Sequence, residues 1–500
     1  MSKSYIRQNI YILTAYLLAL ACFVYILLRA CLLPIFFDEA LSYLNHAIRP
    51  WSDVVLFRGE VLTNNHLLNT LFMKVSAQLF GPQEWALRLG ALLGGILYLT
   101  GSLKVLELFE NPRIFLAGAC VLFINPTLLE IFSAARGYAL EIGLLMWGLY
   151  YFLLWAKQTI KEEKPLLYAL WLWTAATLAH LAFLYVYLSF VIIVILDAFL
   201  NRAGPKPKRF FVHLVFSGIL LFTIYRIPIE VMRKTNELDE GGVLGFWQDT
   251  VRSLINVSFY WQNYPNFVGI LIQWLIAFTM IGAGLVLVGL YKKRIRADGR
   301  ADIFLAVTTL LFILVGLLII LWHILHIKYI IQRRAYYFIP LFWIFAIALW
   351  AVAAPHFGKL TKTLSRAGVV LLIAVLAAHF LSVANLRYFC VSPYDTDIRE
   401  LMRDLKVMTR GSSWRARSKS LATDWLFFPT VAFYKMKYGL DWLDWPARLG
   451  MRQKFDFYIL SENPAVRADY PGLDFNAKKI PYNFRIIKRY PTQIFLAVAQ

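Results

Sequence analysis

Residues 10–39 read IYILTAYLLALACFVYILLRACLLPIFFDE, an apolar run that ends in two adjacent carboxylates, Asp38 and Glu39. As a helix, a run of this length crosses the roughly 30 Å hydrocarbon core of a bilayer. Two neighbouring carboxylates at the end of a membrane span are costly to desolvate, so such pairs usually have a function. The stretch therefore predicts a membrane protein with a candidate site at the bilayer surface.

Similar runs recur along about the first 390 residues of the 500-residue chain. The composition agrees, because 60% of the residues are hydrophobic and 16% are charged, whereas about a quarter are charged in soluble domains. The runs are continuous and lack the two-residue alternation of a membrane β-barrel. The sequence predicts a polytopic α-helical membrane protein with about eleven spans. The expected spans are residues 10–33, 89–108, 113–131, 138–155, 166–182, 183–199, 211–228, 266–290, 302–322, 336–354 and 367–386.

Basic residues set the expected orientation of these spans. The net charge is +21, but many basic residues lie in short loops between spans, which argues against a nucleic-acid-binding protein. By the positive-inside rule these loops face the cytoplasm. We expect a bacterial inner (plasma) membrane protein with a cytoplasmic N-terminus and with residues 34–88 and the C-terminal segment outside. The basic loops are 157–164, 202–209, 292–300 and 359–366.

Two regions lie outside the expected spans. In the outer loop 34–88, apolar residues recur at helical spacing, which predicts interfacial helices against the bilayer; the alternative makes 66–81 a further span, despite its polar side chains. Residues 387–500 carry many charges and no long apolar run, so they predict a small extracytoplasmic α/β domain after a transmembrane domain of residues 1–386. Its expected elements are helices at 397–408 and 425–438 and strands at 420–423, 455–460, 484–488 and 494–498.

Acidic and basic side chains at the outer ends of spans are the first site candidates. Asp38 can act as a general base toward a hydroxyl group, because partial burial tunes the proton affinity of a carboxylate; the alternative is a solvated turn. Arg88 begins the second span, where its guanidinium can bind a phosphate through two parallel hydrogen bonds or can simply snorkel to the interface. Arg136 lies in an outer turn beside Tyr138. The alternative is that this turn is simply the solvated end of a helical hairpin. Arg333 and Arg334 open the tenth span from outside, contrary to the charge rule, which favours an anion site.

Histidines are the second group of candidates. His66 follows Thr63-Asn64-Asn65, and His180 lies in the turn between the fifth and sixth spans, where a lone histidine is more often a satisfied polar residue than a ligand. His323 and His326 are three residues apart, so they can share a helix face and contact a substrate or a divalent metal, although no carboxylate is near in sequence. The four cysteines show no metal-site spacing. A divalent metal is thus a possible cofactor, and no cofactor is certain.

The sequence lacks the common short motifs of nucleotide binding, zinc-dependent catalysis and serine hydrolysis. It contains no Walker loop, Rossmann fingerprint, HExxH or nucleophile elbow. If the protein transfers a group, its donor must arrive already activated. A sugar linked to a lipid phosphate fits, because the phosphate is a leaving group and the tail partitions into the bilayer.

The order of these motifs resembles the GT-C glycosyltransferases, within them the group that contains protein O-mannosyltransferases and the aminoarabinose transferase of lipid A. The resemblance covers about residues 10–355. It rests on Asp38-Glu39, Glu84-x-x-x-Arg88, Ala135-Arg136-Gly137-Tyr138-Ala139-Leu140, His180 and Arg334-Ala335-Tyr336-Tyr337-Phe338-Ile339-Pro340. Where many relatives have a proline-rich stretch, this chain has Asn64-Asn65-His66-Leu67-Leu68.

The resemblance implies an inverting transfer of a sugar from a polyprenyl-phosphate donor, with or without a metal, at the outer face. The acceptor is then a lipid, a glycan or a protein. Asp38 would deprotonate the acceptor hydroxyl and Glu39 would help to position a substrate. The donor phosphate would be held by basic residues with a tyrosine nearby. These are Arg88, Arg136, Arg333, Arg334 and Tyr337.

Two other functions are compatible with the sequence. A transporter or lipid-linked glycan flippase would show internal repeats or broken spans at the membrane midplane, and neither is evident here. A glycan polymerase or ligase of related fold would use diphosphate-linked donors. Charged residues that gather at one face favour surface chemistry over passage through the membrane.

Overall fold

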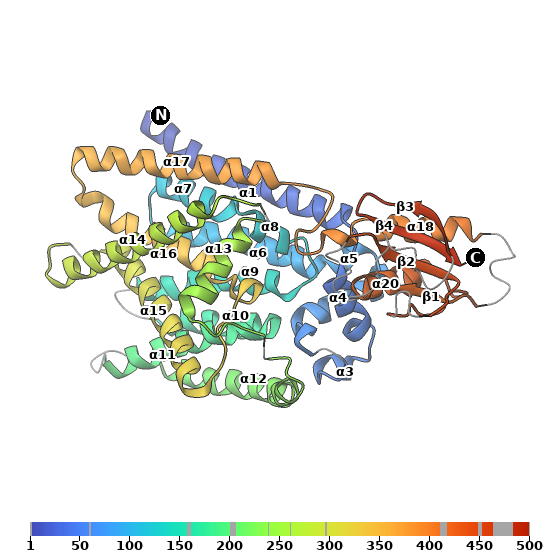
Figure 1. Ribbon diagram of the computed structural model, residues 1–500. Coiled ribbons are helices and arrows are strands. Elements are labelled where there is room, and N and C mark those ends of the chain that lie inside the picture. The colour runs from blue at the N-terminus through green and yellow to red at the C-terminus, as the bar shows by residue number, and fades with distance from the viewer. Residues whose placement is uncertain are drawn as a thin grey trace. The chain divides into compact units, whose positions relative to one another are not determined.

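The computed structural model describes residues 3–59, 62–157, 162–200, 207–238, 240–260, 262–295, 298–410, 418–448, 453–463 and 484–499. It divides into two compact units (Figure 1). One comprises Met1–Leu28, Val55–Phe72 and Arg88–Ala384, and the other Arg29–Val54, Met73–Leu87 and Asn385–Gln500. The predicted boundary between residues 386 and 387 stays a prediction. The basic loops 157–164, 202–209 and 292–300 lie partly outside the described residues.

The first unit is helical. Its helices are α1 (Lys3–Leu32), α6 (Leu89–Glu107), α7 (Pro112–Phe123), α8 (Pro126–Ile131), α9 (Gly137–Ala156), α10 (Glu163–Ala179), α11 (Leu184–Leu200), α12 (Lys208–Lys234), α13 (Arg252–Ser258), α14 (Asn266–Tyr291), α15 (Gly299–Leu325), α16 (Phe338–Ala353) and α17 (Lys359–Val383). Short helical turns are η2 (Leu62–Asn64), η3 (Leu181–Phe183), η4 (Phe246–Val251), η5 (Gln332–Ala335) and η6 (Ala354–His356). The polytopic α-helical class is therefore confirmed.

Nine helices in the described part of the chain are long and apolar enough to cross a membrane. Two of the eleven expected spans, 113–131 and 166–182, are not among these nine. The run 113–131 is broken at Asn125-Pro126, where proline removes a backbone donor and the Asn125 side chain accepts from the Leu128 amide at 3.0 Å to cap α8. Helix α10 is continuous and has 17 residues, as many as the predicted span. The break in 113–131 follows from local chemistry that hydropathy alone does not show.

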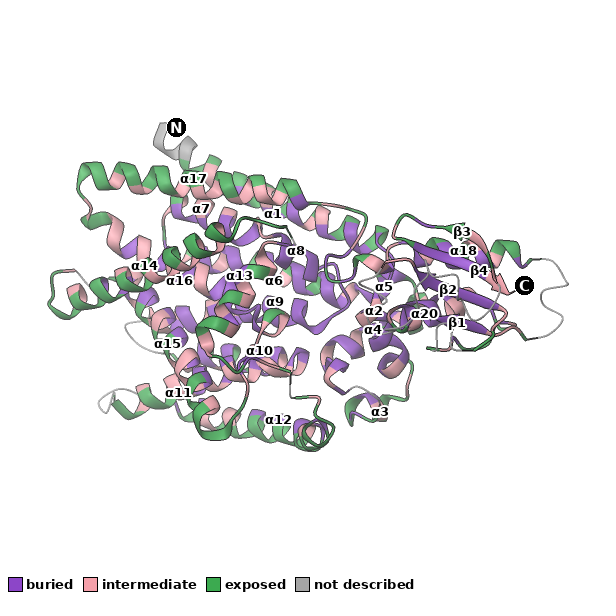
Figure 2. Ribbon diagram, in the orientation of Figure 1, coloured by how far each residue is buried: buried purple, intermediate pink, exposed green. Residues whose placement is uncertain are grey.

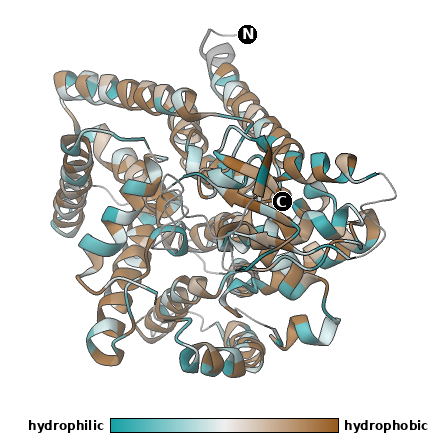
Figure 3. Ribbon diagram, turned by 45° about the vertical axis from the view of Figure 1, so that its right-hand side comes forward, coloured by the Kyte–Doolittle hydropathy of each residue, from teal (hydrophilic) through white to brown (hydrophobic). Residues whose placement is uncertain are grey.

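Burial separates the inner helices of this unit from the outer ones. In α9, 72% of the most apolar window is buried, whereas the values for α14 and α17 are 11% and 6%. Figure 2 shows this contrast between α9 and α17, and Figure 3 shows that the helices are mainly hydrophobic. A helix that is apolar on its exposed side faces lipid rather than water. Helices α14 and α17 therefore present apolar surface to the bilayer, while α6, α9 and α10 form the core.

The second unit joins short helices to a sheet. Its helical elements are α2 (Phe37–Ser42), η1 (Tyr43–Ala47), α3 (Trp51–Val55), α4 (Leu67–Phe80), α5 (Glu84–Leu87), η7 (Pro393–Asp395), α18 (Ile398–Met408), η8 (Trp425–Phe427) and α20 (Phe428–Lys437), of which α3 and α4 extend into residues of the first unit. With 14 residues, α4 is too short to span a bilayer. Exposed apolar side chains such as Trp51 and Leu79 agree with interfacial helices.

The sheet has four strands in the order β1-β2-β4-β3. They are β1 (Leu421–Thr423), β2 (Phe457–Ser461), β3 (Phe484–Arg489) and β4 (Ile494–Ala499). Strand β1 pairs parallel to β2, with Leu421 opposite Phe457, and the other pairs are antiparallel. Tyr458, Leu460 and Phe495 pack in its core. All four strands and both helices expected after residue 387 are present, within about three residues of their predicted ends.

Candidate active site

Asp38 and Glu39 lie in the first turn of α2, which is separated from α1 by residues 33–36. Phe36 is extended, and its amide donates to Glu39 Oε2 at 3.3 Å, so the Glu39 carboxylate caps the helix from its third position. The Glu39 side chain is fully buried, whereas Asp38 is half-buried. The two adjacent carboxylates thus have different surroundings, and Asp38 is the more accessible one.

A third carboxylate, which the sequence analysis missed, holds the start of α2. Asp395 is 1% exposed, and its Oδ2 accepts from the Phe37 amide at 2.8 Å and from Ser392 Oγ at 2.7 Å, while Thr430 Oγ1 lies 2.9 Å from Oδ1. Burial raises the pKa of Asp395 to about 7, the hydrogen bonds oppose that rise, and the charge of Asp38 adds to it. Its only sequence signal is a turn, Ser392-Pro393-Tyr394-Asp395.

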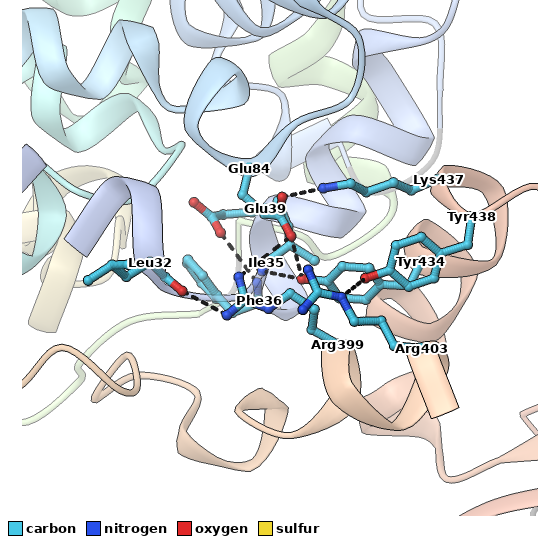
Figure 4. Close-up of polar contacts among 10 residues, drawn as sticks. All are labelled: Leu32, Ile35, Phe36, Glu39, Glu84, Arg399, Arg403, Tyr434, Lys437 and Tyr438. Carbon is cyan, nitrogen blue, oxygen red and sulfur yellow. Dashed lines mark hydrogen bonds and ion pairs between the residues drawn. The ribbon is translucent and has the colours of Figure 1, made fainter. Parts of the chain in front are cut away.

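The backbone just before α2 is held by side chains from α18 and α20 (Figure 4). Arg399 Nη2 donates to the Leu32 carbonyl at 2.8 Å, and the Ile35 amide donates to the Tyr434 hydroxyl at 2.9 Å. Together with the hydrogen bond from the Phe37 amide to Asp395, these contacts hold the backbone at three positions within residues 32–37. The turn that presents Asp38 is therefore built by residues about 360 to 400 positions later in the chain.

Glu84, the acidic residue of the expected Glu84-x-x-x-Arg88 motif, is a partner of α20. Tyr434 donates to Glu84 Oε1 at 3.0 Å, and Lys437 forms an ion pair with Oε2. Burial and then the charge of Glu84 raise the pKa of Tyr434 well above its ordinary value, so this phenol stays a hydrogen-bond donor. Glu84 thus joins α5 to α20.

A buried polar cluster lies in the first unit and contains three of the predicted site residues. His180 Nδ1 is 2.8 Å from Glu141 Oε2, and the rings of His66 and His180 have centroids 5.3 Å apart. Arg136 donates to Asn64 and its guanidinium lies 5.8 Å from the centre of the Tyr138 ring. The structure brings His66, Arg136 and His180 together at the ends of η2, α9 and α10. Burying so many polar groups costs free energy that their mutual contacts must offset, which makes this cluster a candidate functional site.

The other predicted site residues are Arg88, Arg333, Arg334 and Tyr337, and Tyr337 is near enough to Glu141 of this cluster to interact with its charge. Arg88 is fully buried immediately before α6. Arg334 forms an ion pair with Glu240 and donates to its backbone carbonyl, so its charge is balanced by this loop. Tyr337 is also fully buried, and within the described residues its hydroxyl has no hydrogen-bond partner. Arg333 is half-buried beside Arg334.

Metal binding receives no support. In the part of the chain that the structure describes, no group of three or more His, Cys, Asp or Glu side chains is arranged to hold an ion. His323 and His326 are exposed, and His326 ends α15 in a left-handed conformation with φ +53°. The predicted possibility of a divalent metal therefore remains unsupported.

Comparison of the chain with known proteins identifies its fold but no family. No family model matches the chain, and no curated protein does. ArnT from Cupriavidus metallidurans, solved bound to undecaprenyl phosphate, matches with 13% identity over 96% of this chain and 97% of that chain, with a TM-score of 0.51. The chain has an ArnT-like fold. ArnT from the same organism in the apo state matches with 12% identity over 99% and 98% of the two chains, with a TM-score of 0.49. The resemblance expected from the motifs is confirmed at the level of fold.

Proposed function

We propose that this protein is an integral membrane glycosyltransferase that moves a sugar from a polyprenyl-phosphate donor to a lipid, glycan or protein acceptor, with inversion. One observation carries the proposal: over almost its whole length the chain has the fold of ArnT, which has been solved bound to undecaprenyl phosphate. The multi-pass helices agree with a donor that stays in the bilayer. We place the protein in a bacterial inner membrane, with the N-terminus cytoplasmic and the C-terminal segment outside.

In the proposed reaction Asp38 is the general base. The acceptor hydroxyl transfers its proton to the Asp38 carboxylate while its oxygen forms a bond to the anomeric carbon of the sugar. The bond between that carbon and the phosphate oxygen breaks, and its electron pair leaves with the polyprenyl phosphate. One displacement inverts the anomeric centre. Glu39 is a positioning residue, because its carboxylate accepts from the Phe36 amide and fixes the turn.

Basic residues of the first unit would hold the donor phosphate. Arg136 is our first candidate, because it is buried among polar side chains in the cluster with His66 and His180. Arg88 is buried too, and a buried guanidinium gains most from an anionic ligand. Arg333, Arg334 and Tyr337 are further candidates. For Arg334, binding a phosphate would compete with Glu240.

The test is transfer from labelled polyprenyl-phosphate sugars to washed envelope membranes by the purified protein in lipid nanodiscs. Mass spectrometry of co-purified lipid selects the donor. Loss of a general base costs about 10²–10⁴-fold in rate, so Asp38→Asn is expected to lose at least about 100-fold. Asp53→Asn removes a carboxylate from α3 in the same outer loop, and we expect it to keep nearly the wild-type rate.

Two outcomes contradict the proposal. Full transfer by a folded Asp38→Asn protein removes the base assignment. Movement of a lipid-linked glycan across the liposome bilayer with no donor consumed, in place of transfer, indicates a flippase or transporter.

A further inference from the structure

A solvent-accessible cavity of about 990 Å³ lies in the first unit, in the connection from α12 to α14. Its walls come from the segments 241–259, which includes η4 and α13, and 262–273, and from Ile331. The volume is at the upper end of the range for ligand sites, about 300–1,000 Å³. No residue predicted from the sequence as a site residue lines it.

The walls are fixed by hydrogen bonds to the chain that precedes α16. Gly242 and Tyr329 exchange two backbone hydrogen bonds of 2.9 Å. Thr250 Oγ1 donates to the Ile330 carbonyl at 2.7 Å, and the Gln332 amide donates to Ser253 Oγ at 2.9 Å. The cavity is therefore a built feature of the fold and not a gap beside a loose loop.

The cavity is lined by carboxamides. A carboxamide both donates and accepts hydrogen bonds, as a sugar hydroxyl does, whereas a phosphate at neutral pH mainly accepts and an acyl chain does neither. The aromatic rings of Phe259 and Tyr264 add flat apolar surface. The lining carboxamides are Gln248, Asn256, Gln262, Asn263, Asn266 and Gln273.

Several of these groups are available to a ligand. Among the residues that the structure describes, the side chains of Gln248, Asn256 and Asn263 and the guanidinium of Arg252 make no hydrogen bond or ion pair, and all four are exposed. Asp249, the acidic side chain of the lining, is already engaged, because its Oδ2 accepts from the Leu244 and Gly245 amides at 2.7 and 2.9 Å. The available chemistry is neutral and polar, with one cation.

We propose that this cavity binds a saccharide, the glycan portion of the acceptor. The inference rests on the proposed glycosyltransferase function and narrows the acceptor to one that carries sugar residues. The size of the cavity favours more than one sugar ring, which the single sugar of the donor does not supply. Carboxamides hold the hydroxyls, the rings stack on sugar faces, and Arg252 accommodates an acidic substituent.

Kinetics separate an acceptor site from a donor site. The double variant Gln248→Ala/Asn263→Ala is compared with wild type for transfer of label from the polyprenyl-phosphate sugar to graded amounts of envelope membranes. The expected result is at least a tenfold rise in the apparent KM for acceptor, with the donor KM and the kcat unchanged. Gln8→Ala, which removes an exposed carboxamide from α1 outside the cavity, leaves all three values unchanged.

Other outcomes overturn the inference. If the double variant has an unchanged acceptor KM, or a raised donor KM alone, the cavity is not an acceptor site. If Arg252→Gln raises the acceptor KM while the double variant does not, the site binds an anion instead of a saccharide. If wild-type protein transfers no sugar, the proposed function fails first.

A second measurement needs no turnover. A photo-crosslinking residue is placed at position 263 in the full-length protein in cells, and the adducts are analysed by mass spectrometry. The saccharide site predicts carbohydrate on the adduct at 263 and none on an adduct at position 8. An adduct at position 263 that contains only lipid or only protein contradicts the saccharide site.

Discussion

At the scale of single residues, the hydrogen bonds around Asp395 can accommodate a neutral carboxyl group. Thr430 Oγ1 lies 2.9 Å from both Asp395 Oδ1 and the Phe427 carbonyl, but its hydroxyl has one hydrogen. If the Thr430 hydroxyl donates to the Phe427 carbonyl, then a protonated Asp395 can donate from Oδ1 to Thr430 Oγ1. The Phe37 amide and Ser392 still donate to Oδ2. A neutral carboxyl therefore satisfies every group, which agrees with a pKa of about 7.

This geometry predicts a pH dependence of stability. The pKa of Asp395 is about 7 in the fold and about 3.9 in the unfolded chain, so the folded state binds the proton more tightly. Its contribution to stability is complete below about pH 4 and is lost as pH rises to about 7. Between pH 5 and 8 the wild-type protein should lose on the order of 2 kcal/mol from this group. Thermal unfolding in detergent measures the loss.

Asp395→Asn is the matched variant for that prediction. Its carboxamide donates to Thr430 and accepts from the Phe37 amide and Ser392, so it keeps the shape of the neutral carboxyl. We expect its melting temperature to depend less on pH between 5 and 8 than that of wild type. The same pH profile in both proteins would show that Asp395 does not titrate in this range.

Residue-scale prediction from the sequence was uneven for a physical reason. Asp38 and Glu39 could be proposed from the sequence because adjacent carboxylates at the end of an apolar run are unusual. Asp395 could not be proposed, because its contact with the Phe37 amide joins residues 358 positions apart in the sequence. The carboxamides of the cavity are spread over η4, α13, α14 and the segment before α14, and no motif in the sequence joins them.

At the scale of elements, the strands and amphipathic helices were predictable, and the long apolar runs were less so. The short apolar runs 455–460 and 494–498 locate β2 and β4 within about two residues, although these strands do not alternate and are buried over most of their length. Hydropathy located the run 113–131 but not its break, which depends on Asn125-Pro126. For residues 66–81 the sequence favoured an interfacial helix over a span, because the stretch is short and contains Asn69, Lys74 and Gln78.

Packing of α6 against α9 depends on glycine. A Cβ added at Gly143 would lie 2.4 Å from the Gly94 carbonyl oxygen, a backbone atom that cannot turn away. Overpacking of this kind costs about 1–3 kcal/mol, so Gly143→Ala should lower the melting temperature by several degrees. Gly316→Ala on α15 is the matched control, because no other atom would lie within 4 Å of its Cβ. Equal melting temperatures for the two variants would mean that the two helices separate easily.

At the scale of the whole molecule, the second unit is assembled from three separate segments, Arg29–Val54, Met73–Leu87 and Asn385–Gln500. A single hydroxyl joins all three, because Tyr434 accepts from the Ile35 amide and donates to Glu84 Oε1. Contacts between segments this distant cannot be inferred from one sequence without an alignment. They make the C-terminal residues part of the structure that presents Asp38, rather than a separate appendage.

Tyr434→Phe tests this assembly. The variant keeps the buried ring but leaves the Ile35 amide and Glu84 without that hydroxyl, and an unsatisfied buried polar group costs about 1–3 kcal/mol. Amides of α2 should therefore exchange with deuterium roughly tenfold faster or more, as measured by mass spectrometry, with α9 unchanged. Tyr438→Phe removes a hydroxyl that accepts only from Arg403 at 3.1 Å among its described contacts, and it should leave α2 protected. Faster exchange of α2 in both variants would indicate that α20 is loosened in general. Unchanged exchange of α2 in both variants would show that α2 is stable without the Tyr434 hydroxyl.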